Sequence, residues 1–254
     1  MEPTKDGKLQ LIYIFPNLFT AASAFLGVVS ILASTNGEFQ KAAIYILLSL
    51  IFDGLDGRVA RMTKTTSKFG AEFDSLADIV AFGVAPAMLF YFNVGHEFGK
   101  VGSLVAAMYV VFGAIRLARF NVMAGSSEPS VFIGVPIPTA AVVIAMWVLM
   151  HEEYQFMRSI EWSMLIGQGM LSFLMVSNIR YPSFKKVDFQ KAHVIKILIY
   201  LTIAFSLIYL YPIETATTMI TAYLMYGMVR ALYNLIVAKW KKNKYNTPNS
   251  EKET

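Results

Sequence analysis

Four aspartates are the residues of this sequence whose type and spacing can do chemistry. Asp53 and Asp56 stand three residues apart in one apolar segment, and Asp74 and Asp78 stand four residues apart in the next. On a helix with about 100° per residue, the first pair lies roughly 60° apart and the second roughly 40° apart. Each pair therefore shares one helix face, and two such faces can meet if the helices are neighbours.

Residues with almost no side chain accompany these acids. Gly57 and Ala60 follow the first two aspartates by four residues each, and Gly70 precedes Asp74 by four residues. A helix face lined in this way leaves the backbone open beside the carboxylates. The pattern favours a site in which a bulky group presses against the helices.

The acids are costly in an apolar setting, which argues for a function. A charged aspartate at the centre of a membrane costs about 2.5 to 3.5 kcal/mol, so four cost on the order of 10 kcal/mol. Four oxygen donors suit one or two Mg²⁺ or Mn²⁺ ions, which commonly bridge substrate phosphates. Zinc is disfavoured because the chain has no cysteine and its three histidines lie elsewhere. The structural alternative is ion pairing with the arginines nearby, Arg58, Arg61, Arg116 and Arg119.

The elements that must position these acids are membrane helices. Of the 254 residues, 56% are hydrophobic and 15% are charged, whereas soluble domains carry about 25% charged residues. Runs of about 20 apolar residues span the roughly 30 Å of hydrocarbon in a bilayer. We expect an all-α fold, a polytopic integral membrane helical bundle of about eight transmembrane helices. The expected segments are Leu11–Ala33, Ala42–Ala60, Ala71–Tyr91, Val101–Phe120, Val131–Met150, Trp162–Val176, Val194–Leu210 and Thr215–Val237.

The distribution of basic residues predicts the orientation. If both termini lie on one side, 19 of the 22 lysines and arginines lie there too, and only Lys41, Lys100 and Arg158 lie opposite. By the positive-inside rule both termini and the acids face the cytoplasm, at the cell inner or cytoplasmic membrane. The net charge of +5 then reflects topology and attraction to anionic lipid headgroups, without nucleic acid. We expect one transmembrane catalytic domain over residues 1–240 and a polar cytoplasmic tail over 241–254.

The spacing of the motif resembles that of a known family. Its residues read Asp53-x2-Asp56-Gly57-x2-Ala60-Arg61-x8-Gly70-x3-Asp74-x3-Asp78. This pattern is similar to the signature of the CDP-alcohol phosphotransferases, with every fixed position present. The resemblance covers roughly residues 1–178, the first six helices, and leaves 179–240 as two additional helices. Within the family, the stretches Phe69 to Ala87, Arg116 to Asn121 and Gly134 to Pro138 resemble the phosphatidylserine synthase branch.

The resemblance implies an activity and a metal site. It implies transfer of a phosphatidyl group from CDP-diacylglycerol to the hydroxyl of L-serine with release of CMP, by an enzyme that forms a homodimer. Asp53 would bridge two divalent ions, Asp56 and Asp74 would hold the first, and Asp74 would also reach the second. Asp78 would contact the second ion and take the proton of serine as the catalytic base.

The resemblance also implies contacts to the nucleotide of CDP-diacylglycerol. They map onto Asn17, Thr20, Gly57, Arg61 and Ser67. For Gly57 there is an independent reason, because its missing side chain exposes backbone beside Asp56. For Asn17 and Thr20, which follow Pro16, ordinary turn and capping chemistry is the alternative.

Two arginines form the last candidate group. Arg116 and Arg119 are three residues apart near the predicted cytoplasmic end of the fourth segment. A guanidinium group offers a planar fork that suits a carboxylate or phosphate, so the pair is predicted to bind serine or a substrate phosphate. The alternatives are a positive anchor at the membrane surface or partners for the aspartates.

Other functions remain open on sequence alone. Another family member would use glycerol-3-phosphate or inositol phosphate as acceptor, or an archaeal-type lipid as donor. A different class is a transporter, in which intramembrane acids relay protons or bind cations. A transporter is expected to place its acids near the bilayer midplane and to show repeated halves, whereas these acids lie at the ends of two adjacent segments.

Overall fold

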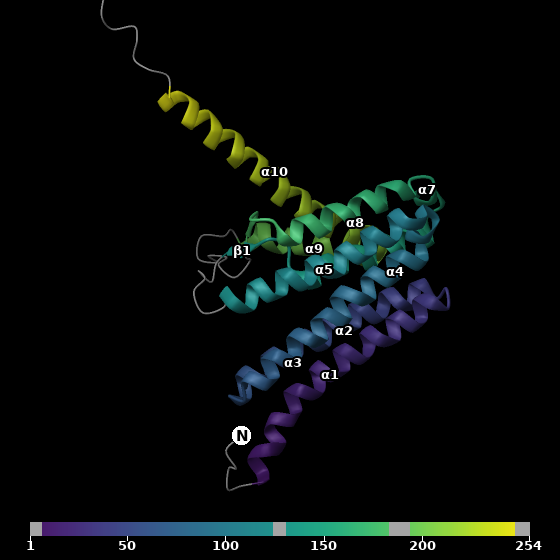
Figure 1. The fold of residues 1–254 in the computed structure, drawn as a ribbon, viewed down its shortest axis with the longest axis vertical. Helices are drawn as coiled ribbons and strands as arrows, with labels where there is room; N and C mark the ends of the chain where they lie inside the picture. The colour runs from purple at the N-terminus through teal and green to yellow at the C-terminus, as the bar shows by residue number, and fades with distance from the viewer. Residues whose placement is uncertain (1–6, 124–130, 183–193, 247–254) are drawn as a thin grey trace, which may run out of the picture.

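The computed structural model describes residues 7–123, 131–182 and 194–246, which form a bundle of helices (Figure 1). Its helices are α1 (Gly7–Thr35), α2 (Phe39–Thr63), α3 (Lys68–Asp78), η1 (Ile79–Val84), α4 (Ala85–Asn93), η2 (Gly95–Phe98), α5 (Gly99–Met123), α6 (Ile137–Glu153), α7 (Gln155–Arg158), α8 (Glu161–Val176), α9 (Val194–Leu210) and α10 (Pro212–Asn246). Two short strands, β1 (Val131–Ile133) and β2 (Arg180–Pro182), pair antiparallel with Phe132 opposite Tyr181. The predicted all-α fold class is confirmed.

The predicted start of the fifth segment is wrong by six residues. We expected a helix from Val131, but residues 131–133 form β1 and α6 begins at Ile137. Gly134 has a φ of +74°, a conformation that L side chains avoid. Pro136 follows directly and serves as the N-cap of α6. These two residues end the strand and turn the chain into the helix.

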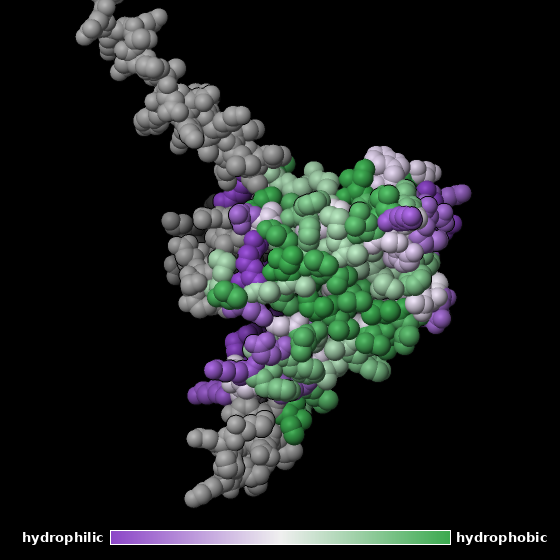
Figure 2. Space-filling model, viewed as in Figure 1, coloured by the Kyte–Doolittle hydropathy of each residue, from purple (hydrophilic) through white to green (hydrophobic). Residues whose placement is uncertain are grey.

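The structure supports a membrane protein but does not establish eight spans. In the described part of the chain, three helical stretches are long and apolar enough to cross a membrane: Ile14–Thr35, Lys68–Asn93 and Gly95–Met123. The helix over Leu198–Leu210 is apolar but shorter. Figure 2 shows a hydrophobic band across the molecule with hydrophilic residues at both of its margins. Such a band is what a protein in contact with lipid requires.

Close packing of α1 joins the elements that carry the site. Gly27 on α1 lies so near α3's continuation η1 that an added Cβ would come 2.7 Å from the Ala81 Cα. On its other side, α1 is tied to α2 by the Ser23 and Ser49 hydroxyls, which lie 2.7 Å apart. Hydrogen bonds between small polar side chains hold membrane helices together where the hydrophobic effect cannot. The acid-bearing helices α2 and α3 are therefore both held against α1.

Of the two additional helices, α10 packs against α6, and α9 packs against α10. Trp147 on α6 donates a 3.2 Å hydrogen bond to the Thr221 hydroxyl on α10. The predicted polar tail begins inside α10, which continues to Asn246, and residues 247–254 lie outside the described residues.

At the end of the bundle far from the aspartates, His151 Nε2 lies 2.9 Å from Glu161 Oε1 and ties α6 to α8.

Candidate active site

A tight reversal between α2 and α3 brings the acidic faces together. Lys64 ends α2 in the left-handed conformation, with a φ of 55°. Ser67 then caps α3 by accepting a 3.0 Å hydrogen bond from the Gly70 N–H. An N-cap hydroxyl of this kind satisfies one of the free N–H groups at a helix start. Because the reversal is so short, the acids near the end of α2 face those on α3.

Three of the four aspartates converge on one point. Asp53, Asp56 and Asp74 each offer a carboxylate oxygen, and these oxygens all lie within 4.8 Å of one another. Asp56 is buried, and Asp53 and Asp74 are half-buried. Such a set of hard oxygen donors at short separation is the kind that Mg²⁺ and Mn²⁺ prefer.

Asp78 lies one turn further along and faces Asp53. Its Oδ1 atom is buried and has no hydrogen-bond partner among the described residues. A buried oxygen without a partner is expensive, so this atom has capacity for a ligand or a proton. Asp53, Asp56 and Asp74 fit a site for a divalent cation, and Asp78 lies beside Asp53 outside this convergent group.

Ion pairing does not account for the acids. Within the described part of the chain, the structure has no ion pair between any of the four aspartates and an arginine; the pairs it has involve Lys41, His96 and His151. The direct ion pairs of the structural alternative are therefore absent among the described residues, although Asp78 lies near enough to Arg116 for their charges to interact.

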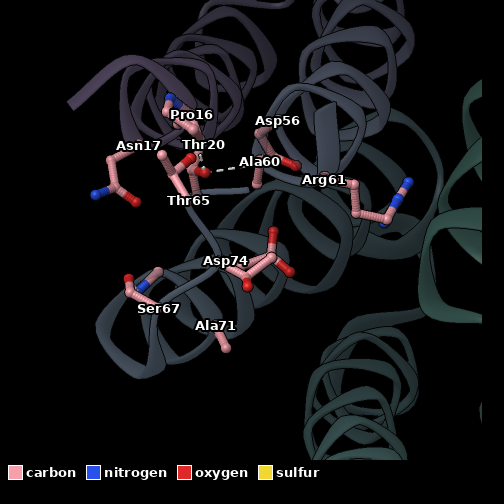
Figure 3. A pocket seen from close by; sticks show the side chains of 13 residues that line it. Pro16, Asn17, Thr20, Asp56, Ala60, Arg61, Thr65, Ser67, Ala71 and Asp74 are labelled. Carbon is pink, nitrogen blue, oxygen red and sulfur yellow. Dashed lines mark hydrogen bonds between the residues drawn. The ribbon is translucent and has the colours of Figure 1, made fainter. Parts of the chain in front are cut away.

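A cavity of about 250 Å³ opens beside the aspartates, between α1, α2 and α3 (Figure 3). Its lining includes all five predicted nucleotide contacts: Asn17, Thr20, Gly57, Arg61 and Ser67. Two of the four aspartates, Asp56 and Asp74, also line it. The cavity thus joins the predicted nucleotide site to the predicted metal site.

The glycines of the motif make room for polar side chains. A Cβ on Gly70 would lie 3.2 Å from Ser67 Oγ and 3.3 Å from Asn17 Oδ1. A Cβ on Gly57 would lie 3.3 Å from the Arg61 Nη1. The absence of a side chain at these positions lets Asn17, Ser67 and Arg61 lie close to the helix backbones.

Thr20 has a partner that the sequence did not suggest. Its hydroxyl lies 2.6 Å from Asp56 Oδ2 and is buried at the wall of the cavity. This contact, drawn as a dashed line in Figure 3, reaches from α1 to α2. Thr20 therefore orients one of the candidate metal ligands, besides lining the cavity.

Thr65 is a lining residue that the sequence analysis missed. It lies in the reversal after α2, is buried, and contacts the Thr63 hydroxyl at 2.7 Å. The only indication in the sequence was that Thr65 belongs to a short polar run, Lys64-Thr65-Thr66-Ser67, between the two parts of the aspartate motif. Polar runs of that length are common in loops, so the sequence carried no specific indication.

The two arginines of α5 have different surroundings. Arg116 is buried, and its Nε atom has no hydrogen-bond partner among the described residues. The negative charge of Asp78 interacts with the Arg116 guanidinium group. Arg119 directs Nη1 to the Val176 carbonyl at 2.8 Å and Nη2 to the Ser177 carbonyl at 3.2 Å. A ligand role stays a prediction for Arg116, whereas both terminal nitrogens of Arg119 already bind the end of α8.

Sequence comparison identifies the family. The sequence profile described as CDP-alcohol phosphatidyltransferase matches residues 13–174. The chain belongs to the CDP-alcohol phosphatidyltransferase family. This confirms the resemblance seen in the aspartate motif, and the matched residues include the three convergent acids, Asp78 and the cavity.

Several relatives in this family are similar over most of their length. The CDP-diacylglycerol–serine O-phosphatidyltransferase of Helicobacter pylori strain J99 is 49% identical, over 92% of this chain and 97% of the relative. The enzyme of the same name from Bacillus subtilis is 34% identical over 67% of this chain and 91% of the relative. The archaetidylserine synthase of Methanothermobacter thermautotrophicus is 38% identical over 70% of this chain and 73% of the relative.

Proposed function

We propose that this CDP-alcohol phosphatidyltransferase transfers the phosphatidyl group of CDP-diacylglycerol to the hydroxyl of L-serine, giving phosphatidylserine and CMP. The observation that carries the choice of serine is the 49% identity to the Helicobacter pylori serine enzyme along nearly its whole length. Convergence of Asp53, Asp56 and Asp74 beside a cavity supports the chemistry. Membership of a transferase family also argues against the transporter alternative.

The cavity binds the nucleotide end of the lipid in this proposal. Asn17 and Ser67 offer hydrogen-bonding groups at one wall, and Arg61 brings a positive charge at the other. The acyl chains extend into the surrounding bilayer along the apolar faces of the helices. In this proposal the pyrophosphate lies next to Asp56 and Asp74, which line the same cavity.

Two Mg²⁺ or Mn²⁺ ions would be held by Asp53, Asp56, Asp74 and Asp78. When bound, the ions would supply positive charge that neutralises the pyrophosphate as the bond from the phosphatidyl phosphorus to the CMP oxygen breaks. By the family resemblance, Asp53 and Asp74 would each contribute to holding both ions. The unpartnered Oδ1 of Asp78 supports its inclusion in the set.

Serine then reacts by direct displacement. The serine hydroxyl oxygen attacks the phosphorus of the phosphatidyl group, the bond from that phosphorus to the CMP oxygen breaks, and CMP leaves with the electron pair. Asp78 accepts the hydroxyl proton, which a free carboxylate does weakly near neutral pH. Arg116 binds the serine carboxylate through its planar guanidinium group.

The proposal includes a place in the cell and an assembly. Both termini and the cavity face the cytoplasm at the cell inner membrane, where the basic residues gather. Residues 1–240 form the catalytic domain, with the family core in 1–178 and two further helices in 179–240. The homodimer implied by the family resemblance is part of the same proposal.

An acceptor screen tests the function. Purified enzyme with radiolabelled CDP-diacylglycerol is given serine, glycerol-3-phosphate, inositol phosphate or water, and lipid products and CMP are measured. We expect lipid product with serine and not with the other acceptors. Preferential use of glycerol-3-phosphate or inositol phosphate would refute the serine assignment and leave the family chemistry in place.

A second candidate differs only in the donor lipid. The 38% identity to an archaetidylserine synthase raises the possibility of an archaeal-type lipid in place of diacylglycerol. Repeating the serine reaction with both CDP-activated lipids separates the two, because the acceptor and the CMP leaving group stay the same and only the lipid part of the donor changes. We expect the diacylglycerol donor to give the higher kcat/KM.

A further inference from the structure

The end of α5 nearest the aspartates carries three polar side chains that reach different parts of the bundle. They are Arg116, Arg119 and Asn121. Arg116 lies among buried residues near Asp78, Arg119 reaches α8, and Asn121 reaches α3. One end of α5 is thus connected to two neighbouring helices, α8 and α3.

Arg119 anchors α5 to the end of α8. Besides the carbonyls of Val176 and Ser177, it donates to the Asn178 side-chain oxygen at 3.3 Å. The last carbonyls of a helix have no partner within the helix, so a cation that donates to them stabilises the helix end. Gly134 allows this approach, because an added Cβ would lie only 2.4 Å from the Met175 carbonyl oxygen.

Asn121 anchors the same end of α5 to the acid-bearing helix. Its Nδ2 donates a 2.8 Å hydrogen bond to Ser75 Oγ on α3. The Ser75 hydroxyl in turn donates to the Ala71 carbonyl at 3.0 Å, which leaves its oxygen free to accept from Asn121. Ser75 directly follows Asp74 and precedes Asp78 by three residues, so the contact lies between the two acids of α3.

Two buried polar atoms lie on the helices that the Asn121 contact joins, α5 and α3. Arg116 Nε and Asp78 Oδ1 are both buried, and neither has a hydrogen-bond partner among the described residues. Arg116 is on α5 and Asp78 is at the end of α3, so their separation depends on how those helices are held. A ligand that contacts both atoms needs that separation to be constant.

We propose that Ser75 and Asn121 are positioning residues that set the distance between Arg116 and Asp78, and thereby the fit of the acceptor alcohol. Arg119 provides the second anchor, at α8. This inference rests on the proposed function, in which Arg116 binds the serine carboxylate and Asp78 takes the hydroxyl proton. The nucleotide cavity is lined by residues of α3 as far as Asp74, but neither Ser75 nor Asn121 lines it, so we expect the pair to act on the acceptor more than on CDP-diacylglycerol.

The test compares Ser75→Ala, Asn121→Ala and the double variant with the parent enzyme. A single hydrogen bond of this kind corresponds to about a three- to tenfold effect. We expect each single variant to lower kcat/KM for serine by about three- to tenfold, with the KM for CDP-diacylglycerol unchanged. Because both residues act through one bond, the double variant is expected to be no worse than either single variant.

Matched variants separate positioning from a general loss of stability. Ser75→Thr keeps the hydroxyl and is expected to restore the serine kcat/KM. Ser103→Ala removes a hydroxyl that bonds its own helix backbone, to the Gly99 carbonyl at 3.3 Å, at the opposite end of α5. It is expected to leave both substrates unaffected, and the thermal unfolding midpoints of all variants are expected to agree.

Three results would overturn the inference. They are equal losses for both substrates, additive losses in the double variant, or no change in the serine kcat/KM. Failure of the proposed function is distinguishable, because the parent enzyme would then fail to use serine in the acceptor screen. If the parent uses another acceptor, the same variants are measured with that acceptor, and an unchanged kcat/KM would again overturn the positioning role.

Discussion

The Thr20 hydroxyl lies 2.6 Å from Asp56 Oδ2 across the interface of α1 and α2. The contact joins a residue predicted to bind the nucleotide to a residue predicted to bind a metal ion. A side chain that hydrogen-bonds a metal ligand fixes its orientation, and loss of such a partner typically costs about 10- to 100-fold in metal affinity or activity.

Thr20→Val is therefore expected to raise the Mg²⁺ concentration for half-maximal activity by about 10- to 100-fold. Valine keeps the shape of threonine and removes the hydroxyl. The measurement is CMP release against Mg²⁺ concentration, with Thr35→Val at the far end of α1 as the matched control, because the exposed Thr35 hydroxyl donates to the Leu32 carbonyl of its own helix. A change confined to the KM for CDP-diacylglycerol would instead make Thr20 a nucleotide contact.

Asp53→Asn is expected to lower metal-dependent turnover by about a hundredfold or more, since several kcal/mol of charge stabilisation are lost. Chelation with EDTA is expected to abolish the activity of the parent enzyme, and Mg²⁺ or Mn²⁺ to restore it. Glu72→Gln is the control, because Glu72 is an exposed acid on α3 outside the convergent group. Full activity after exhaustive chelation would exclude the two-metal mechanism.

Arg116→Lys is expected to raise the serine KM by about tenfold to a hundredfold, because a charge-assisted contact of about 1.5 to 3 kcal/mol is lost. The KM for CDP-diacylglycerol is expected to stay the same. Serinol keeps the hydroxyl and amine but lacks the carboxylate, so it is expected to be a poor acceptor for parent and variant alike. Arg119→Lys, at the α8 anchor, is the comparison, and serinol working as well as serine would contradict the assignment of Arg116.

The predicted orientation can be tested by thiol labelling, since the chain has no cysteine of its own. Lys68→Cys at the start of α3 is expected to resist a membrane-impermeant reagent in intact cells, whereas Glu97→Cys in η2 is expected to react. Both side chains are accessible at the surface of the fold, because Lys68 is exposed and the Glu97 side chain is 63% exposed. The reverse pattern would place the aspartates outside the cytoplasm.

The sequence by itself determined the parts of this protein that depend on local geometry. Helix periodicity alone puts Asp53 with Asp56, and Asp74 with Asp78, on one face each. Eight motif positions at set spacings were enough to recognise the family, which sequence comparison confirms. The apolar segments predicted helices that the fold contains. The start of α6 is the exception, because Gly134 and Pro136 keep the apolar residues before them out of the helix.

Only the tertiary structure decided which side chains meet across helices. Nothing local to α5 distinguishes Arg116 from Arg119. Arg116 is buried without a partner for its Nε atom among the described residues, and Arg119 binds the end of α8, because of how the helices are rotated and placed. The Thr20 contact to Asp56 and the Asn121 contact to Ser75 join residues 36 and 46 positions apart. Such pairings are set by the packing of small residues such as Gly27 against Ala81, and the hydrophobic period of a helix carries no information about its neighbour's rotation.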